Sequence, residues 1–226
     1  MYMSKILISG CGISWSFQER PTWVNVLKIC GVDIDDRAGP AISNQLILDN
    51  MISAVINKSY NQVICQFTGM GKLDVEMNNQ ERHEELVKKD SIRNFTYNNY
   101  WPSSVSSEHL SKKLYYQYLH SPTLEENNLI YKWMLLDKIC KEKNIRLHTM
   151  LGYKIEWTNP LHTKINTDFN FKIYECYEQS DFYKYHDHSC IKNTVPNKKF
   201  AVWLAKYINN NFLKLDLEKL KKFKEN

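Results

Sequence analysis

Residues Lys5 to Ser16 read KILISGCGISWS, and this stretch decides the fold class. Its apolar run, Ile6 to Ile8, stops at Ser9-Gly10-Cys11-Gly12, and an aromatic, serine-bearing segment follows at once. A short apolar run that ends at glycines is typical of a buried strand that leads into a functional loop. We therefore interpret the stretch as the first strand of an α/β sheet and the loop after it as the edge of a site.

Strands and helices alternate in the segments that follow. A short amphipathic helix is predicted to start at Pro21-Thr22-Trp23 and to end at Gly31, and a second helix to open at Ser43-Asn44. Further strands are predicted at Val32 to Ile34 and at Asn61 to Thr68. The order β, α, β, α, β is typical of a doubly wound parallel sheet.

An insertion at residues 72 to 107 interrupts this pattern after the third strand. It is polar and rich in Asn, and it contains Tyr97, Tyr100 and Trp101. A connection of this length in a compact domain is more often a lid or a binding insertion than filler, with a partly disordered loop as the alternative. Its aromatic side chains could stack on a sugar or a base.

The second half of the chain is predicted to add further helices and one or two strands. Residues 169 to 177 fit an edge strand or a short helix equally well. The other predicted elements are helices at Glu108 to Leu119, from Ser121 to near Asn144, at Asn197 to Asn211 and at 213 to 224, and a strand at Ile145 to Met150. No change in composition divides the chain, so residues 1 to 226 are taken as one domain.

Composition limits the class of protein. Lys and Arg number 30 against 25 Asp and Glu, and much of the excess lies in the basic helix at 213 to 224. Such a local excess is usually a solvated face, so nucleic acid is an unlikely partner. No apolar run reaches the length of a membrane span and no secretory signal begins the chain, so we expect a soluble, cytoplasmic protein.

The six cysteines form no CxxC pair and have no metal-ligand spacing. Several lie inside apolar runs, which favours reduced, buried thiols in an intracellular protein. We therefore predict no structural metal and no cofactor.

Four segments together resemble blocks of the SGNH (GDSL-like) hydrolase family, in its divergent phage and bacterial branch. They are KILISGCGISWS, RAGPAISNQLI, NQVICQFTG and DHSC…VPNKKFAVWLAKYI. The resemblance implies a three-layer, flavodoxin-like sandwich around a parallel sheet. It also implies a nucleophilic Ser in the loop after the first strand, Gly and Asn as oxyanion donors, and an Asp and His near the C-terminal helix.

The chain departs from the family pattern at its most important position. Gly12 stands where the family has its nucleophilic serine, and Thr68-Gly69-Met70-Gly71 stands where the third block has its Asn. The Asp and His of the last block are adjacent here, as Asp187 and His188, instead of being separated by two residues.

Ser14 is the hydroxyl nearest to the vacant position and is our candidate nucleophile. The alternative is that Ser14 caps a helix or bonds to the backbone. Cys11 is a second candidate, since helix N-terminal amides can lower the pKa of a thiol, but a packing role is the favoured alternative for it.

The remaining candidate residues would serve the same reaction. His188 is the preferred base and Asp187 its orienting partner, with a surface loop as the alternative; His186 and His188 without a third ligand make a weak metal site. Gly39 and Asn44 are the candidate oxyanion donors, or else Asn44 belongs to a helix cap. The other residues expected to line the site are Gly10, Cys11, Gly12, Thr68 and Gly69.

Two functions of different class follow from these residues. The first is an esterase that removes an O-acyl group from a small or carbohydrate ester. The second is a catalytically silent protein of the same fold that binds a ligand or a protein assembly partner, in a viral particle for example, and Gly12 favours it. Nucleic-acid binding through the C-terminal helix is the third and least supported.

Overall fold

The computed structural model describes residues 5–10, 14, 22–39, 42–70, 73–76, 97–100, 118, 120–152, 155, 171–172 and 194–223. Of residues 73–76, 97–100, 171–172 and 194–199 it describes the backbone.

A five-stranded parallel sheet lies at the centre of the molecule, in the order β2-β1-β3-β6-β7. The strands are β1 (Ile6–Ser9), β2 (Ile34–Asp36), β3 (Gln62–Phe67), β6 (Arg146–Leu151) and β7 (Phe171–Lys172). The chain leaves β1 towards β2 at one edge and returns to β3 on the other side of β1. The strand order therefore reverses between β1 and β3, and open α/β sheets bind ligands at such a point, at the carboxyl ends of the strands.

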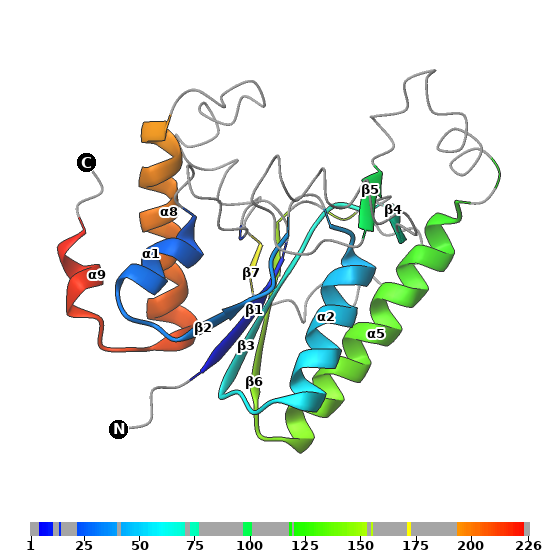
Figure 1. Cartoon of the computed structure of the whole chain (residues 1–226), viewed down its shortest axis with the longest axis horizontal. Coiled ribbons are helices and arrows are strands. Elements are labelled where there is room, and N and C mark those ends of the chain that lie inside the picture. The colour runs from blue at the N-terminus through cyan, green and yellow to red at the C-terminus, as the bar shows by residue number, and fades with distance from the viewer. Residues whose placement is uncertain are drawn as a thin grey trace.

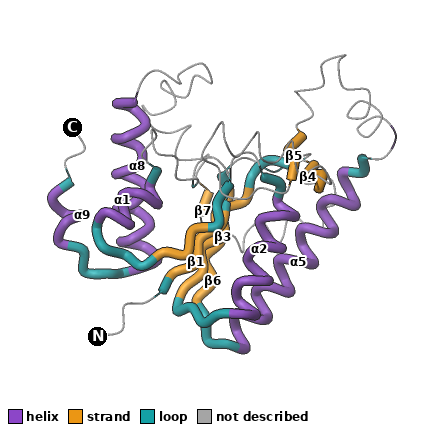
Figure 2. The backbone as a smooth tube through the Cα atoms, viewed as in Figure 1, coloured by secondary structure: helices purple, strands orange, loops and turns teal. Residues whose placement is uncertain are grey.

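Helices cover both faces of the sheet, which makes the fold α/β (Figure 1). α2 (Asn44–Asn57) and α5 (Pro122–Glu142) lie side by side on one face, and α1 (Trp23–Ile29) and α8 (Thr194–Ile208) lie on the other. The tube in Figure 2 shows the strands between these two helical layers. The predicted α/β class is confirmed.

Capping residues fix where the helices begin, as the sequence predicts. Thr22 accepts a hydrogen bond from the backbone of Asn25 at the start of α1, and Ser43 accepts one from Leu46 at the start of α2. Ser121 caps α5 in the same way. After α1 the backbone turns at Gly31 with a φ of 93°, a conformation that glycine adopts without strain.

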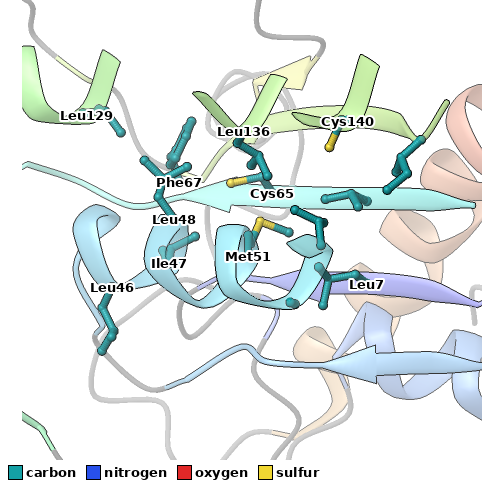
Figure 3. Packing of buried hydrophobic residues seen from close by; sticks show 14 of the residues in the cluster. Leu7, Leu46, Ile47, Leu48, Met51, Cys65, Phe67, Leu129, Leu136 and Cys140 are labelled. Carbon is teal, nitrogen blue, oxygen red and sulfur yellow. The ribbon is translucent and has the colours of Figure 1, made fainter. Parts of the chain in front are cut away.

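The strand residues alternate between two apolar cores. Leu7, Val63 and Phe67 belong to the core under α2 and α5, where Figure 3 shows Leu7 and Phe67. Ile6, Ile8, Ile64 and Met150 point into the core under α1 and α8. β1 and β3 are buried on both faces of the sheet, which explains why the runs Ile6–Ile8 and Val63–Cys65 are apolar without alternation.

Two of the cysteines confirm the prediction of buried thiols. Cys65 and Cys140 are buried in the core under α2 and α5, and Cys30 is half-buried. Burial raises the pKa of the Cys140 thiol to about 12 and also raises that of Cys65. Both side chains are therefore uncharged packing residues.

Two elements at the first edge strand and in the insertion differ from prediction. β2 begins at Ile34 rather than at Val32, because the amide of Val32 donates to the Leu27 carbonyl and so completes the end of α1. The insertion contains a two-stranded antiparallel sheet of β4 (Leu73–Glu76) and β5 (Tyr97–Tyr100), where an irregular segment was expected.

The C-terminal helices also differ from prediction. α8 ends at Ile208, a π-helical turn η5 (Asn209–Leu213) follows, and α9 covers only Glu218–Lys222 instead of the expected 213 to 224. Lys214 adopts a left-handed backbone with φ 52°, and the side chain of Asn209 bonds to both backbone polar groups of Leu215. These contacts separate α9 from the preceding helix.

The edge-strand alternative holds for part of 169 to 177, since β7 pairs with β6 there. The helix predicted at Glu108 to Leu119 lies almost entirely outside the described residues.

Candidate functional site

The candidate site lies where β1 and β3 end, beside the point of strand reversal. Gly10 follows β1, Thr68 follows β3 and Gly152 follows β6, so three neighbouring strands bring these residues to one edge. Ser14 reaches the same edge, because its hydroxyl bonds to a side chain near the end of β3.

Ser14 is fully buried, and its hydroxyl makes two side-chain hydrogen bonds. The Oγ donates to Oε1 of Gln66 at 2.7 Å and accepts from the indole Nε1 of Trp23 at 3.0 Å. A primary amide cannot take up the serine proton as a general base does. The described contacts thus hold Ser14 in place without activating it.

Gln66 occupies a narrow space between two glycines. Its side chain is fully buried, and its Nε2 donates to the Phe67 carbonyl at 3.1 Å. A Cβ on Gly10 would lie 2.7 Å from Gln66 Oε1 and 3.1 Å from Ser14 Oγ, and a Cβ on Gly152 would collide with Gln66 Nε2 and lie 2.9 Å from the Phe67 carbonyl. Glycines at both positions are therefore what makes room for the Gln66 amide.

Asn44 joins the first turn of α2 to the end of β3. Its Oδ1 accepts from the backbone N–H of Thr68 at 2.8 Å, and its Nδ2 donates to the Thr68 carbonyl at 3.1 Å. The side chain is buried, and both ends of its amide are engaged. Asn44 thus bonds to Thr68 as a neighbouring strand would, and the Asn44 Nδ2 that was expected to serve as an oxyanion donor is engaged in this contact.

Gly39 joins the segments that follow β1 and β2, much as Asn44 joins α2 to β3. Its backbone N–H donates to the carbonyl of Gly10 at 2.9 Å, and nearby the hydroxyl of Ser9 donates to the carbonyl of Arg37 at 3.2 Å. The Gly39 amide is therefore bonded to the loop after β1. An oxyanion could use it only after that bond breaks.

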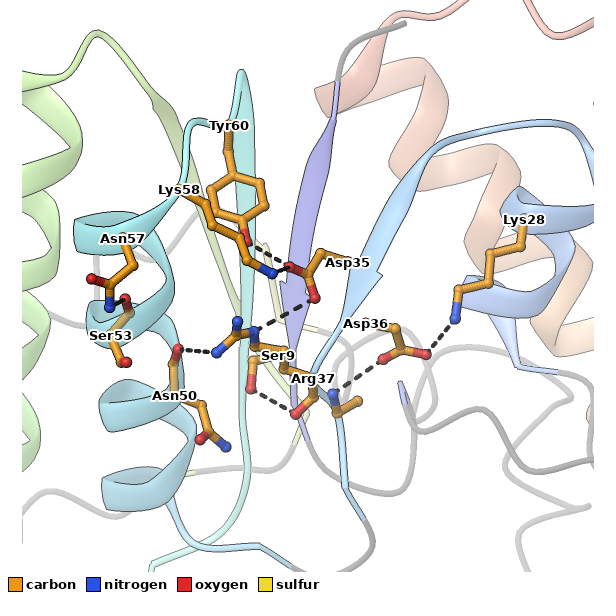
Figure 4. Close-up of polar contacts among 11 residues, drawn as sticks. Ser9, Lys28, Asp35, Asp36, Arg37, Asn50, Ser53, Asn57, Lys58 and Tyr60 are labelled. Atoms are coloured by element: carbon orange, nitrogen blue, oxygen red, sulfur yellow. Dashed lines mark hydrogen bonds and ion pairs between the residues drawn. The ribbon is translucent and has the colours of Figure 1, made fainter. Parts of the chain in front are cut away.

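A second polar cluster lies along β2 and is drawn in Figure 4. Asp35 accepts from Tyr60 at 2.6 Å and from Lys58 at 3.2 Å, while Asp36 pairs with Lys28 at 2.7 Å. Burial and the bond to Asp35 raise the pKa of Tyr60 to about 12. Burial also opposes the charge of Asp35, but its hydrogen bonds outweigh that cost and lower its pKa. These acids have partners of opposite charge and stabilise the edge strand.

The structure brings five of the candidate residues, Gly10, Ser14, Gly39, Asn44 and Thr68, to one edge of the sheet, with Gly69 next in the chain. Cys11, Gly12, His186, Asp187 and His188 lie outside the described residues. Among the residues that are described, no group of three or more His, Cys, Asp or Glu side chains is placed to hold a metal ion. None of the described helices is long and apolar enough to cross a bilayer.

Sequence reasoning missed Gln66, Trp23 and Gly152 as members of this edge. Gln66 is the polar residue in the otherwise apolar stretch VICQF, Val63 to Phe67, and a buried amide needs partners. That signal could have identified Gln66. It could not have identified Ser14 as the partner, since 52 positions separate the two residues.

Comparison with known proteins gives no family for this chain: neither the scan of protein-family models nor the search of curated proteins finds a match. The candidate site is therefore interpreted from its own geometry.

Proposed function

We propose that this chain is a catalytically silent protein with the SGNH-like, flavodoxin-like sandwich fold, and that it binds a small or carbohydrate ligand at the carboxyl edge of the sheet. In chain order the parallel strands run 2-1-3-4-5 across the sheet, which is the flavodoxin-like arrangement of a doubly wound fold. This order supports the fold named in the proposal, and its reversal between β1 and β3 supports the location of the ligand.

The proposal rests on the burial of the Ser14 hydroxyl and on its hydrogen-bond partner. Acyl transfer by a serine needs a hydroxyl that is accessible to the substrate and bonded to a base. Ser14 is inaccessible, and its proton is donated to the neutral amide of Gln66. The candidate oxyanion donors Gly39 and Asn44 are likewise bonded within the chain, as is the backbone N–H of Thr68.

Ester hydrolysis is the second candidate, and one contact favours it. The Trp23 N–H points at Ser14 Oγ, where it would stabilise an alkoxide. In this mechanism Ser14 Oγ would give its proton to a base, with His188 and its neighbour Asp187 as the expected pair, and attack the ester carbonyl. The base would return the proton to the departing alcohol, and water would then hydrolyse the acylated serine to release the acid. The substrate would be a small or carbohydrate O-acyl ester.

Turnover of a short-chain aryl acetate by the parent and by Ser14→Ala separates the two functions. The proposal predicts that the parent and Ser14→Ala turn over the ester equally slowly, at the rate measured with a control protein. A loss of about 100-fold or more in kcat/KM on substitution would instead establish Ser14-dependent hydrolysis.

Ligand binding is tested by thermal unfolding of the parent with acetylated monosaccharides in millimolar excess. A ligand that binds the folded state raises Tm. The proposal expects a rise that Asn44→Ala diminishes, compared with each protein's own ligand-free Tm. If no acetylated or free monosaccharide raises Tm, the carbohydrate part of the proposal is wrong.

A further inference from the structure

Residues 209–223 form the last part of the chain that the structure describes, and we call them the C-terminal segment. The segment consists of η5, the left-handed turn at Lys214 and α9, and α9 lies at the margin of the fold (Figure 1). Its apolar side chains pack against the core under α1 and α8, and its polar and charged side chains from Asn210 on are exposed. The apolar residues are Phe212, Leu213, Leu215, Leu217, Leu220 and Phe223.

Most of the side-chain hydrogen bonds described for this segment stay within it. Asn209 bonds to both backbone polar groups of Leu215, and Lys221 bonds to Asp216 and Glu218. Short units at a chain end whose bonds are local can open while the rest of a protein stays folded. What fastens the segment to the strands therefore decides whether it is open or closed.

The contact with the strands involves Gln62 of β3 and His148 of β6. Gln62 Nε2 donates to the Leu213 carbonyl at 3.3 Å, so Gln62 Oε1 faces His148, whose Nε2 lies 3.1 Å away. Because an amide oxygen only accepts, neutral His148 carries its proton on Nε2. The imidazole also packs on Phe212, with ring centroids 5.0 Å apart. His148 thus orients Gln62 towards the segment and contacts the segment directly.

A second proton on His148 would bind Nδ1, and the surroundings oppose it. Burial, assisted by the positive charge of Arg146, lowers the pKa of His148. Of the other described residues around the ring, Gln62 and Phe212 are uncharged, and Tyr207 of α8 lies beyond Phe212, with ring centroids 6.2 Å apart. Phe212 can ease the charge as a cation–π partner, but the lowered pKa shows that burial and Arg146 outweigh it. Water would reach the charged ring if the segment moved away.

We propose that His148 controls a pH switch: when its ring takes up a second proton, the C-terminal segment opens from the amino end of the sheet while the sheet stays folded. The closed form loses stability relative to the open form as pH falls below about 6.5, because the open form binds the proton more tightly. The opened segment exposes its apolar side chains and the part of the core that they cover. The switch lies at the opposite end of the strands from the candidate site, so it does not depend on the proposed ligand.

Hydrogen–deuterium exchange of the full chain at about pH 7.5 and about pH 5.5, corrected for the intrinsic pH dependence of exchange, tests the proposal. In the parent, the protection of amides in 209–223 should fall at least about threefold in acid, while the amides of β3 keep theirs. His148→Gln should remove this fall.

His120→Gln is the matched control, because His120 bonds to Glu125 at the start of α5 and should leave the fall as in the parent. Equal protection of 209–223 at both pH values, a simultaneous loss in β3, or a fall that His148→Gln does not alter would overturn the proposal.

Arg146 provides a second test that leaves the imidazole in place. Its side chain is exposed, so we expect its variants to fold. Arg146→Gln removes a charge that opposes protonation, and its loss of protection in acid should be smaller than that of Arg146→Lys, which keeps the charge. An equal or larger loss in Arg146→Gln would also overturn the proposal.

Discussion

Each end of β3 carries a buried glutamine whose side chain bonds to a distant part of the chain. At the amino end, Gln62 donates to the Leu213 carbonyl at 3.3 Å, and its Oε1 lies 3.1 Å from Nε2 of His148. At the carboxyl end, Gln66 accepts from Ser14. The glutamines are four residues apart in one strand, so their side chains lie on the same face of the sheet. Each amide ties a segment that is distant in sequence to the sheet.

The comparison gives the Ser14 contact a structural explanation. Open α/β sheets place their ligands at the carboxyl ends of the strands, so nothing in the fold assigns a reaction to the Gln62 end. The same kind of amide contact nevertheless occurs there. The bond between Ser14 and Gln66 is therefore accounted for by the need to satisfy buried polar groups.

The two ends differ in their surroundings. Gln66 lies between Gly10 and Gly152, and its described bonds are to the Ser14 hydroxyl and the Phe67 carbonyl. Gln62 contacts a histidine whose ring also packs on Phe212, with centroids 5.0 Å apart. The carboxyl end should therefore be sensitive to steric change, and the amino end to pH.

The largest effect is expected from Gly152→Ala, which adds a methyl group at the carboxyl end. Its Cβ would meet the Gln66 amide and also the Phe67 carbonyl, and a backbone atom cannot move aside cheaply. We expect a loss of about 3 kcal/mol in the free energy of unfolding, measured by denaturant titration. A loss below about 0.5 kcal/mol would show that the space around Gln66 is not tight.

Removal of each glutamine amide should give a smaller effect, and the carboxyl end should lose more. Gln66→Ala is expected to cost about 2 to 3 kcal/mol, since it opens a cavity and removes the acceptor of Ser14, and Gln62→Ala about 1 to 2 kcal/mol. The measurement is the same titration. Equal costs would remove the distinction between the two ends.

Gln45 provides the matched control for these substitutions. Its Nε2 is the buried side-chain atom that has no hydrogen-bond partner in the described part of the chain. Gln45→Leu should change the free energy of unfolding by less than about 0.5 kcal/mol or increase it, because an unsatisfied amide is replaced by an apolar group.

The smallest effect is a pH dependence at the amino end. Burial, assisted by the charge of Arg146, lowers the pKa of His148 in the folded protein. As pH falls below about 6.5, the unfolded chain takes up this proton before the folded chain does, so the fold loses stability. His148→Gln should reduce the loss between neutral and mildly acidic pH, while Ser14→Ala should leave it as in the parent. A loss unaltered by His148→Gln would contradict this assignment.

The sequence predicts the framework of the fold well, because its signals are local. The apolar runs of β1 and β3 and the caps at Thr22, Ser43 and Ser121 depend on neighbouring residues alone. The start of β2 and the break at Lys214 were missed, since each depends on which backbone groups neighbouring segments have already bonded.

The site was predicted less well, for a physical reason. The sequence indicates that Gly39, Asn44 and Ser14 come to the carboxyl edge, but a residue type does not show whether its polar groups are free. Asn44 could be an oxyanion donor or a structural amide, and its bonds to Thr68 decide for the second role in this structure. Only long-range contacts settle that choice.

Reaction with a fluorophosphonate probe tests the central claim most directly. Such probes phosphonylate activated serine nucleophiles, and the mass of the intact chain and of its Ser14-containing peptide reports the product. The account predicts no addition at Ser14 in the parent, as in Ser14→Ala, under conditions in which a serine esterase is fully modified. Stoichiometric addition at Ser14 that is absent from Ser14→Ala would contradict it.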